Sequence, residues 1–386
     1  MIPASELRPY FPGGFGEPRA FFAPGRVNII GEHTDYNDGF VLPTALDLGI
    51  TVLGARRDDR RVHVTSRQGK KSTEIDIDLS APGPERTGKW GDYVEGMAQS
   101  LIVAGYEIQG AELLLTSDLP SGAGLSSSAA LEISVGFALL SLAGLPVDLV
   151  KLALAGQAAE HRWVGTRCGI MDQLASARAR EGSALLIDCR SLEVRDVHLA
   201  DRSVSILVAD TRVKHSLATS AYNTRREECE RAVSLLQGVL PSIRALRDVS
   251  SDDLAQHGHL LPEPIFRRVR HVVSENEHVL QAVNLLEEKR FDVLGKLLVA
   301  SHRSLQHDYE VSCRELDVLV DAAIQQDGVF GARMTGGGFG GSIVCLVETQ
   351  ALASVKAALS AVSTSAFGRE PGFFVTNGGQ GVHEIH

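Results

Sequence analysis

Residues 119–132, LPSGAGLSSSAALE, place two glycines and three consecutive serines directly before an apolar run. The preceding residues 111–120 read as a strand, and residues from Ser127 to about Leu142 read as a helix. Free backbone N–H groups, the helix dipole and serine hydroxyls would then point at one spot, which favours a bound phosphate. The alternative is a glycine turn with a serine N-cap, but a cap needs one serine rather than three.

Other nucleotide-binding loops do not fit this stretch. A Rossmann loop requires a third glycine where this chain has Ser127, and the glycine loop of protein kinases lies between strands rather than before a helix. A P-loop requires Ser or Thr after Gly-Lys, which is absent at residues 69–70, 88–89 and 295–296. The missing lysine is no obstacle if a metal ion neutralises the phosphates.

A second dense group of polar residues lies near the N-terminus, in APGRVNIIGEHTDYNDGFVLP at residues 23–43. Apolar neighbours place Arg26 and Asn28 on one face of a strand. The run that follows Gly31 resembles a sugar-binding loop, because adjacent sugar hydroxyls need several acceptors at close quarters. The alternative is a solvated polar loop, which would need neither a strand-borne arginine nor the EHTD sequence.

Composition limits the possible classes of protein. A chain of 386 residues with 44% hydrophobic residues is long enough for about two packed domains. A net charge of −10 without a basic tract argues against nucleic-acid or anionic-membrane binding. The five scattered cysteines, without a CxxC pair, indicate a reducing compartment rather than a disulfide framework or a zinc site. Residues 1–14 do not read as a secretory signal and residues 133–147 are too short to span a bilayer, so we expect a cytoplasmic protein.

Strand and helix patterns alternate through both halves of the chain, which predicts an α+β protein of two domains with its site in the cleft between them. We expect the polar stretch 191–202 to separate two strands, and we place the boundary near residue 195, giving domains 1–195 and 196–386. Long helical patterns cover residues 226–240 and 278–305. Near the end, Gly336, Gly338 and Gly341 form a GxGxxG that is followed by a strand, which predicts a tight turn over the site rather than a Rossmann loop.

Together these motifs resemble those of a known kinase family. GRVNIIGEHTDYNDGFVLP is similar to the signature of galactokinases, and residues 301–317 resemble another galactokinase segment. Two further motifs are ones that galactokinases share with homoserine, mevalonate and phosphomevalonate kinases. The ATP loop of that family resembles LPSGAGLSSSAALE, and its third motif resembles MTGGGFGGSIVCL. Asp38 and Gly337 are small departures from the pattern.

The resemblance implies an N-terminal domain like that of ribosomal protein S5 and a ferredoxin-like C-terminal domain. It also implies transfer of the γ-phosphoryl group of ATP, with Mg²⁺, to O1 of α-D-galactose, the first step of galactose catabolism. The implied partners are galactose and ATP, with no obligate protein partner.

The resemblance also assigns roles to individual residues. Asp172, in GIMDQLAS, would be the catalytic aspartate, although an aspartate at a helix start is most often a cap. Arg26 would keep it ionised and offset charge on the phosphoryl group. Glu160, otherwise an exposed helical carboxylate, and Ser128 would bind magnesium, which needs only a few protein oxygens.

The implied sugar contacts are Arg26, Glu32, His33, Thr34, Asp35, Gly169, Asp172 and Tyr222. The implied ATP contacts are Gly122, Ala123, Gly124, Leu125, Ser126, Ser127 and Ser128, with Ser66 and Trp90 near the adenosine. Tyr222 and Trp90 have an alternative role in packing.

Three other functions stay open at this point. The chain could phosphorylate a related sugar such as N-acetylgalactosamine or arabinose. It could be a silent sensor of sugar and ATP, but damage to the serine loop or to Asp172 would then be expected. A homoserine- or mevalonate-type kinase would leave the EHTDY sequence unexplained.

Overall fold

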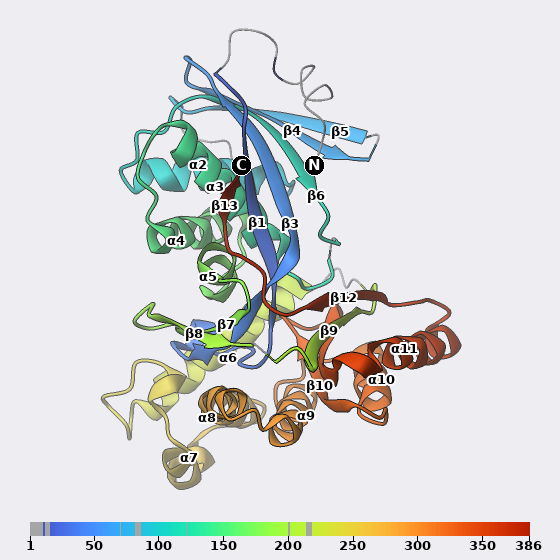
Figure 1. Ribbon diagram of the computed structural model, residues 1–386. Coiled ribbons are helices and arrows are strands. Elements are labelled where there is room, and N and C mark those ends of the chain that lie inside the picture. The colour runs from blue at the N-terminus through green and yellow to red at the C-terminus, as the bar shows by residue number, and fades with distance from the viewer. Residues whose placement is uncertain are drawn as a thin grey trace.

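The computed structural model describes residues 11, 16–69, 71–81, 86–120, 122–199, 201–213 and 218–386. The expectation about a secretory signal therefore falls mostly outside the described residues. Within them the chain forms two β-sheets with helices packed against each, as expected for an α+β protein (Figure 1).

The larger sheet is nine-stranded and runs in the order β13-β1-β3-β6-β4-β5, with β2, β7 and β8 attached beside β3. Its strands are β1 (Arg19–Asn28), β2 (Phe40–Val41), β3 (Pro43–Arg56), β4 (Arg61–Gln68), β5 (Lys71–Asp78), β6 (Ala111–Ser117), β7 (Ser183–Asp188), β8 (Val194–His198) and β13 (His383–Ile385). Four helices lie on one face of it: α2 (Gly91–Val103), α3 (Ser127–Leu142), α4 (Leu149–Ala159) and α5 (Met171–Arg178). A buried core that includes Phe21, Val52 and Leu139 joins the sheet to these helices.

The smaller sheet has the order β10-β11-β9-β12, with all neighbours antiparallel. Its strands are β9 (Val204–Asp210), β10 (Val329–Thr335), β11 (Ser342–Glu348) and β12 (Gly372–Thr376). The helices of this half are α6 (Ala218–Leu236), α7 (Ser251–His257), α8 (Ile265–Glu287), α9 (Phe291–His307), α10 (Arg314–Ala323) and α11 (Leu352–Phe367). Short turns of helix lie at η2 (Asp35–Asn37), η4 (Leu246–Asp248), η5 (Gly258–Leu260) and η6 (Thr349–Ala351), and a π-helix, η3, covers Glu160–Val164.

The sequence patterns located most elements, with two differences. The helix expected from Ser127 to Leu142 has those bounds. The polar stretch 191–202 was wrongly interpreted as a plain connection, because its alternating VRDVH forms β8, which pairs with β7. The pattern at 278–305 spans the end of α8 and most of α9, and the chain turns between them at Lys289, which has a positive φ of 55°.

The expected domain boundary at residue 195 falls inside β8, and the division stays a prediction. The chain also returns to the larger sheet at its end, where β13 pairs with β1. Residues 383–385, near the C-terminus, therefore belong to the larger sheet, whose other strands all lie within residues 19–198.

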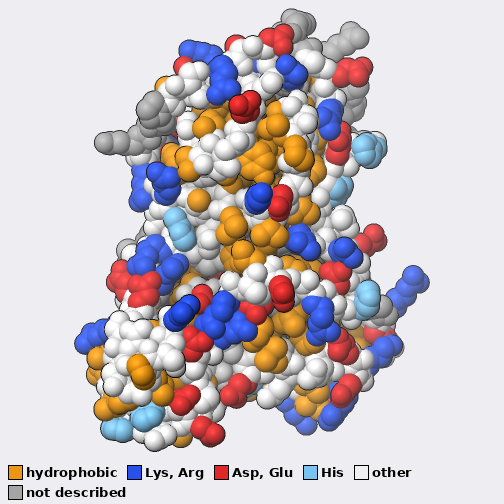
Figure 2. All heavy atoms as spheres, turned by 90° about the vertical axis from the view of Figure 1, so that its left-hand side faces the viewer, with side chains coloured by type: hydrophobic (Ala, Val, Ile, Leu, Met, Phe, Trp, Pro, Cys, Tyr) orange, Lys and Arg blue, Asp and Glu red, His pale blue; other side chains and the backbone are white. Residues whose placement is uncertain are grey.

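The surface seen from the left-hand side of Figure 1 carries basic and acidic side chains in alternation, with hydrophobic side chains between them (Figure 2). Among the described residues, no helix is both long and apolar enough to cross a membrane.

One close backbone approach fixes α9 against β10. A Cβ built on Gly295 would lie 1.9 Å from the carbonyl oxygen of Phe330. We expect Gly295→Ala to lower the free energy of unfolding by about 1–3 kcal/mol, because helix and strand must separate to accommodate the methyl group. Urea denaturation measures this loss. Gly238→Ala is the control, since its Cβ would lie 3.6 Å from the nearest atom; equal effects of the two substitutions would contradict the explanation.

Candidate active site

Two adjoining cavities bring most of the sequence-predicted site residues together. The serine-loop cavity, of about 320 Å³, is lined by Arg26, Gly122, Gly124, Leu125, Ser126, Ser127, Ser128, Thr166, Asp172, Tyr222, Gly337, Gly338 and Phe339. The acidic cavity, of about 210 Å³, is lined by Arg26, Glu32, His33, Asp35, Tyr93, Ser128, Glu160, Thr166, Cys168, Gly169, Met171, Asp172, Tyr222, Gly336 and Gly337. They share six lining residues, among them Arg26, Ser128 and Asp172.

Asp172 lies where the two cavities meet. It sits in the first turn of α5, whose N-cap is Ile170, so its side chain is not the helix cap. Arg26 donates from Nε to Asp172 Oδ1 at 2.7 Å, and its Nη2 lies 2.7 Å from the same oxygen. The Ser126 hydroxyl donates to Oδ2 at 2.5 Å. Both oxygens of Asp172 are thus fixed, and a cation and a hydroxyl stabilise its charge.

Arg26 is aimed by an irregularity in β1. The register of β1 against β3 shifts between Pro24 and Arg26, which turns the arginine side chain toward the serine loop. Its Nη1 donates to the Gly124 carbonyl at 2.7 Å, and only 5% of its side chain is exposed. The guanidinium therefore binds the loop and Asp172 together.

The serine loop presents an open helix N-terminus. Ser126 occupies the N-cap position of α3 with a φ of 58° and makes no side-chain capping bond. Its hydroxyl bonds Asp172 instead, which argues against a simple cap. The first N–H groups of α3 are thus available to an anion. His33 and Phe339 also have positive φ values, of 64° and 57°, so three strained residues line these cavities.

Glu160, in the acidic cavity, forms a polar pair with Ser128, which lines both cavities. The π-helix η3 follows α4 and begins with Glu160, which is buried. Burial raises the pKa of Glu160 to about 7, and hydrogen bonds from Ser128 and Thr166 oppose this rise. Of the described groups that shift this pKa, none is a cation. A carboxylate and a hydroxyl in contact, short of positive charge, are a fitting donor set for Mg²⁺. The described residues hold no cluster of three or more His, Cys, Asp or Glu suited to a metal ion.

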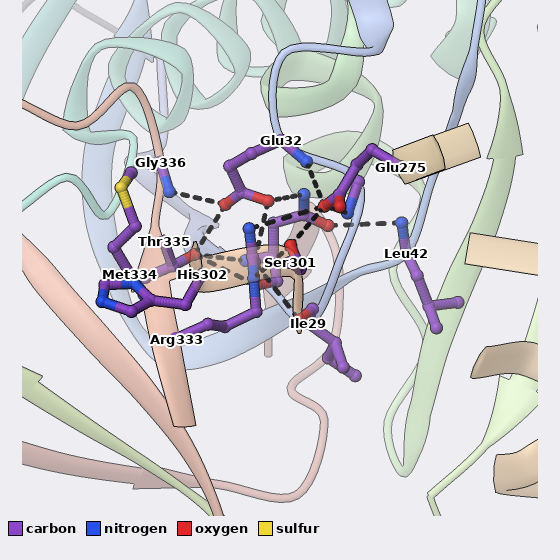
Figure 3. Close-up of polar contacts among 12 residues, drawn as sticks. Ile29, Glu32, Leu42, Glu275, Ser301, His302, Arg333, Met334, Thr335 and Gly336 are labelled. Carbon is purple, nitrogen blue, oxygen red and sulfur yellow. Dashed lines mark hydrogen bonds and ion pairs between the residues drawn. The ribbon is translucent and has the colours of Figure 1, made fainter. Parts of the chain in front are cut away.

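Three polar residues of the EHTD segment face the acidic cavity. Asp35 is buried, and burial together with the charge of Asp172 raises its pKa to about 7. A Cβ on Gly169 would lie 2.0 Å from Asp35 Oδ2, so any side chain there would displace the carboxylate. His33 is also buried, which lowers its pKa to about 3 and keeps it neutral. Glu32 is held by a buried network of contacts (Figure 3).

Some predicted site residues lie outside both linings. Thr34 is fully buried and its hydroxyl donates to the carbonyls of Gly31 and Phe40 at 2.8 and 2.6 Å, which closes the loop. The Ala123 carbonyl accepts from Ser342 Oγ at 2.7 Å. Ser66 lies in β4 and Trp90 packs against the core of the larger sheet. The adenosine roles of Ser66 and Trp90 stay predictions.

Other lining residues were not found from the sequence. Tyr93 projects from α2, and Thr166 and Cys168 precede α5; none belongs to a glycine- or serine-rich motif. Tyr222 was expected, and its ring lies 5.4 Å from those of both His33 and Tyr36. A separate cavity of about 270 Å³, lined by residues of β8, β9, α8 and β11, contains none of the predicted residues.

Comparison with known proteins places this site in a class. The model of the galactokinase galactose-binding signature matches residues 11–56, and those of the GHMP kinase N- and C-terminal domains match residues 92–180 and 282–363. A galactokinase of Chloroflexus aggregans is 47% identical, with 100% of this chain and 99% of the relative covered. A galactokinase of Glaesserella parasuis is 41% identical, with 96% of each chain covered.

Solved structures agree with this class. The structure of Lactococcus lactis galactokinase complexed with galactose matches with a TM-score of 0.93 and 36% identity, covering 99% of this chain and 98% of that one. Methanococcus jannaschii mevalonate kinase matches with a TM-score of 0.66 at 17% identity, covering 97% and 100%, which shows the shared fold alone. The site and fold are those of a GHMP kinase. Within that class, the chain belongs to the galactokinase family.

The raised pKa of Asp35 gives a prediction about stability. The carboxyl keeps its proton to about pH 7 in the folded chain but loses it near 3.8 when unfolded. Folding therefore becomes less favourable as pH rises through this window. Asp35→Asn should then be more stable than the unsubstituted protein at pH 8, by at most about 4 kcal/mol, and near parity at pH 4.

Urea denaturation at pH 4, 6 and 8 measures this difference, with the exposed Asp58→Asn as control. A difference in the free energy of unfolding that stays constant across these pH values would show that the pKa of Asp35 is not raised in the folded protein.

Proposed function

We propose that this protein transfers the γ-phosphoryl group of ATP to O1 of α-D-galactose and so makes galactose 1-phosphate. The observation that carries the proposal is the position of Asp172 at the junction of the two cavities, with both oxygens fixed by Arg26 and Ser126. The galactose-binding signature at residues 11–56 supports the choice of sugar.

ATP phosphates bind in the serine-loop cavity and the sugar binds in the acidic cavity. The open N-terminus of α3 and the hydroxyls of Ser127 and Ser128 favour the phosphates. Asp35, with His33 and Glu32, offers acceptors and a neutral imidazole to the sugar hydroxyls. The shared wall lets O1 of the sugar meet the terminal phosphate beside Asp172.

Asp172 orients the O1 hydroxyl and takes its proton. The transition state of phosphoryl transfer is loose, so the hydroxyl needs little activation before the new bond forms. Orientation therefore comes first, and the proton passes to a carboxylate oxygen as the new O–P bond forms and the bond from the γ-phosphorus to the ADP oxygen breaks, so that ADP leaves. Arg26 holds Asp172 in place through their ion pair and offsets charge on the transferring group.

Ser128 and Glu160 are the residues that would hold Mg²⁺. Bound there together with ATP, this ion would neutralise charge on the phosphates. Its positive charge would lower the raised pKa of Glu160, so the carboxylate would be ionised at neutral pH.

The experiment that tests the function compares sugars directly. Purified protein with ATP and Mg²⁺ is offered galactose, glucose, N-acetylgalactosamine, arabinose or mevalonate, and ADP release is followed. Turnover of galactose well above the others is expected. Turnover of another compound would reassign the kinase, and galactose binding without turnover would identify a sensor.

Asp172→Asn should lower kcat by about 10²–10⁴-fold, because the amide cannot take the proton and loses its ion pair with Arg26. The KM for galactose should change far less, since the amide keeps the size of the carboxylate. Steady-state kinetics measures both constants, with Asp58→Asn as control. A variant with unchanged kcat would remove Asp172 from the reaction.

Glu160→Gln should raise the Mg²⁺ concentration for half-maximal activity by at least about 10-fold, because a neutral amide is a weaker ligand for Mg²⁺. Titration of activity with Mg²⁺ at fixed ATP measures this. The control is Glu181→Gln, an exposed site outside both cavities. An unchanged titration curve would mean that Glu160 is no ligand.

A further inference from the structure

Arg333 is a fully buried arginine in β10, directly before the third motif, MTGGGFGGSIVCL. It lines neither cavity. Its guanidinium lies between two carboxylates from other parts of the chain, Glu32 and Glu275 (Figure 3). Nη1 lies 2.9 Å from Glu32 Oε2, and Nη2 lies 3.7 Å from Glu275 Oε1. An arginine so completely removed from water needs a structural or functional reason.

The remaining contacts of Arg333 hold the start of the EHTD segment. Nη1 also donates to the carbonyls of Asn28 and Ile29, at 3.2 Å each, and Nε donates to Ser301 Oγ at 3.2 Å. Glu275 completes the arrangement, because its Oε1 accepts from the N–H groups of Gly31 and Glu32 at 2.9 and 3.3 Å.

The Glu32 carboxylate is fixed on both oxygens. Oε2 accepts from Asn28 Nδ2 at 2.5 Å and pairs with Arg333, while Oε1 accepts from the Gly336 N–H at 2.7 Å and lies 3.1 Å from Thr335 Oγ1. Glu32 is 1% exposed, and burial raises its pKa, while the charge of Arg333 and the Gly336 N–H oppose this rise. Arg333 supplies the opposite charge in direct contact with it.

We infer that Arg333 is a positioning residue for the sugar site, which holds the Glu32 carboxylate in one orientation at the wall of the acidic cavity. This inference rests on the proposed function. Arg333 acts through Glu32 and touches no substrate. Its contacts within the described chain lie on the side of the EHTD segment, with none to the serine loop.

The inference separates the two substrates. Loss of the Arg333 guanidinium group should weaken galactose binding and leave ATP binding nearly unchanged. We expect Arg333→Lys to raise the KM for galactose by about 10–100-fold, because a single ammonium group cannot bridge Glu32, Glu275 and two carbonyls. The KM for ATP should stay within about 2-fold.

Arg268→Lys is the matched control. Like Arg333, Arg268 is buried, at 2% exposed, pairs with two carboxylates, Glu228 and Glu310, and lines neither cavity. Unlike Arg333, it does not contact Glu32. Both variants should lose stability, and only Arg333→Lys should shift galactose binding. Calorimetric titration with galactose alone measures this binding without turnover, so it tests Arg333 even if the assay of the proposed function fails.

Ser301→Ala keeps the inference testable if Arg333→Lys does not fold. Ser301 bonds Arg333 Nε and Glu275 Oε1, at 3.2 and 2.7 Å, and touches neither Glu32 nor the cavities. A rise of about 2–5-fold in galactose Kd is expected, because Arg333 loses one of its restraints. Equal changes in the KM for galactose and ATP, or the same change in Arg268→Lys, would overturn the inference.

Discussion

The contact between two glycine turns fixes the geometry on which the site depends. The turn at residues 122–125 comes before α3, and the turn at 336–341 joins β10 to β11. A Cβ on Gly336 would lie 2.9 Å from the Gly124 carbonyl, and one on Gly341 would lie 3.2 Å from that of Ala123. The two backbones can approach so closely only because side chains are absent. The helical N-terminus and the smaller sheet thereby share one cavity wall.

The electrostatics of the site follow from this enclosure. Asp35, Glu160 and Asp172 line one cavity, and burial raises the pKa of the first two to about 7. Arg26 is the cation in direct contact with Asp172. The site is short of positive charge, and the Mg²⁺ that we propose Glu160 and Ser128 would hold would offset part of this deficit.

Local sequence motifs predicted the parts of the site that depend on neighbours in the chain. The sequence of the serine loop predicted helix α3, because glycines, serines and an apolar run follow one another without interruption. Strand β8 was missed because its alternation is short and rich in charge. The π-helix that presents Glu160 was also missed, since a single extra residue in a helical turn leaves no mark on hydrophobic periodicity.

Contacts between distant segments could not be predicted from the sequence. The pairing of β13 with β1 returns the C-terminus to the first sheet and depends on tertiary packing alone. Arg333 stood beside a recognised motif, yet nothing nearby in the sequence indicates that it meets Glu32, which lies about three hundred positions earlier. An arginine is rarely fully buried unless a carboxylate pairs with it. The burial of Arg333 in β10 therefore requires an acidic partner from another part of the chain. Only the folded chain shows that Arg333 is buried and that its partner is Glu32.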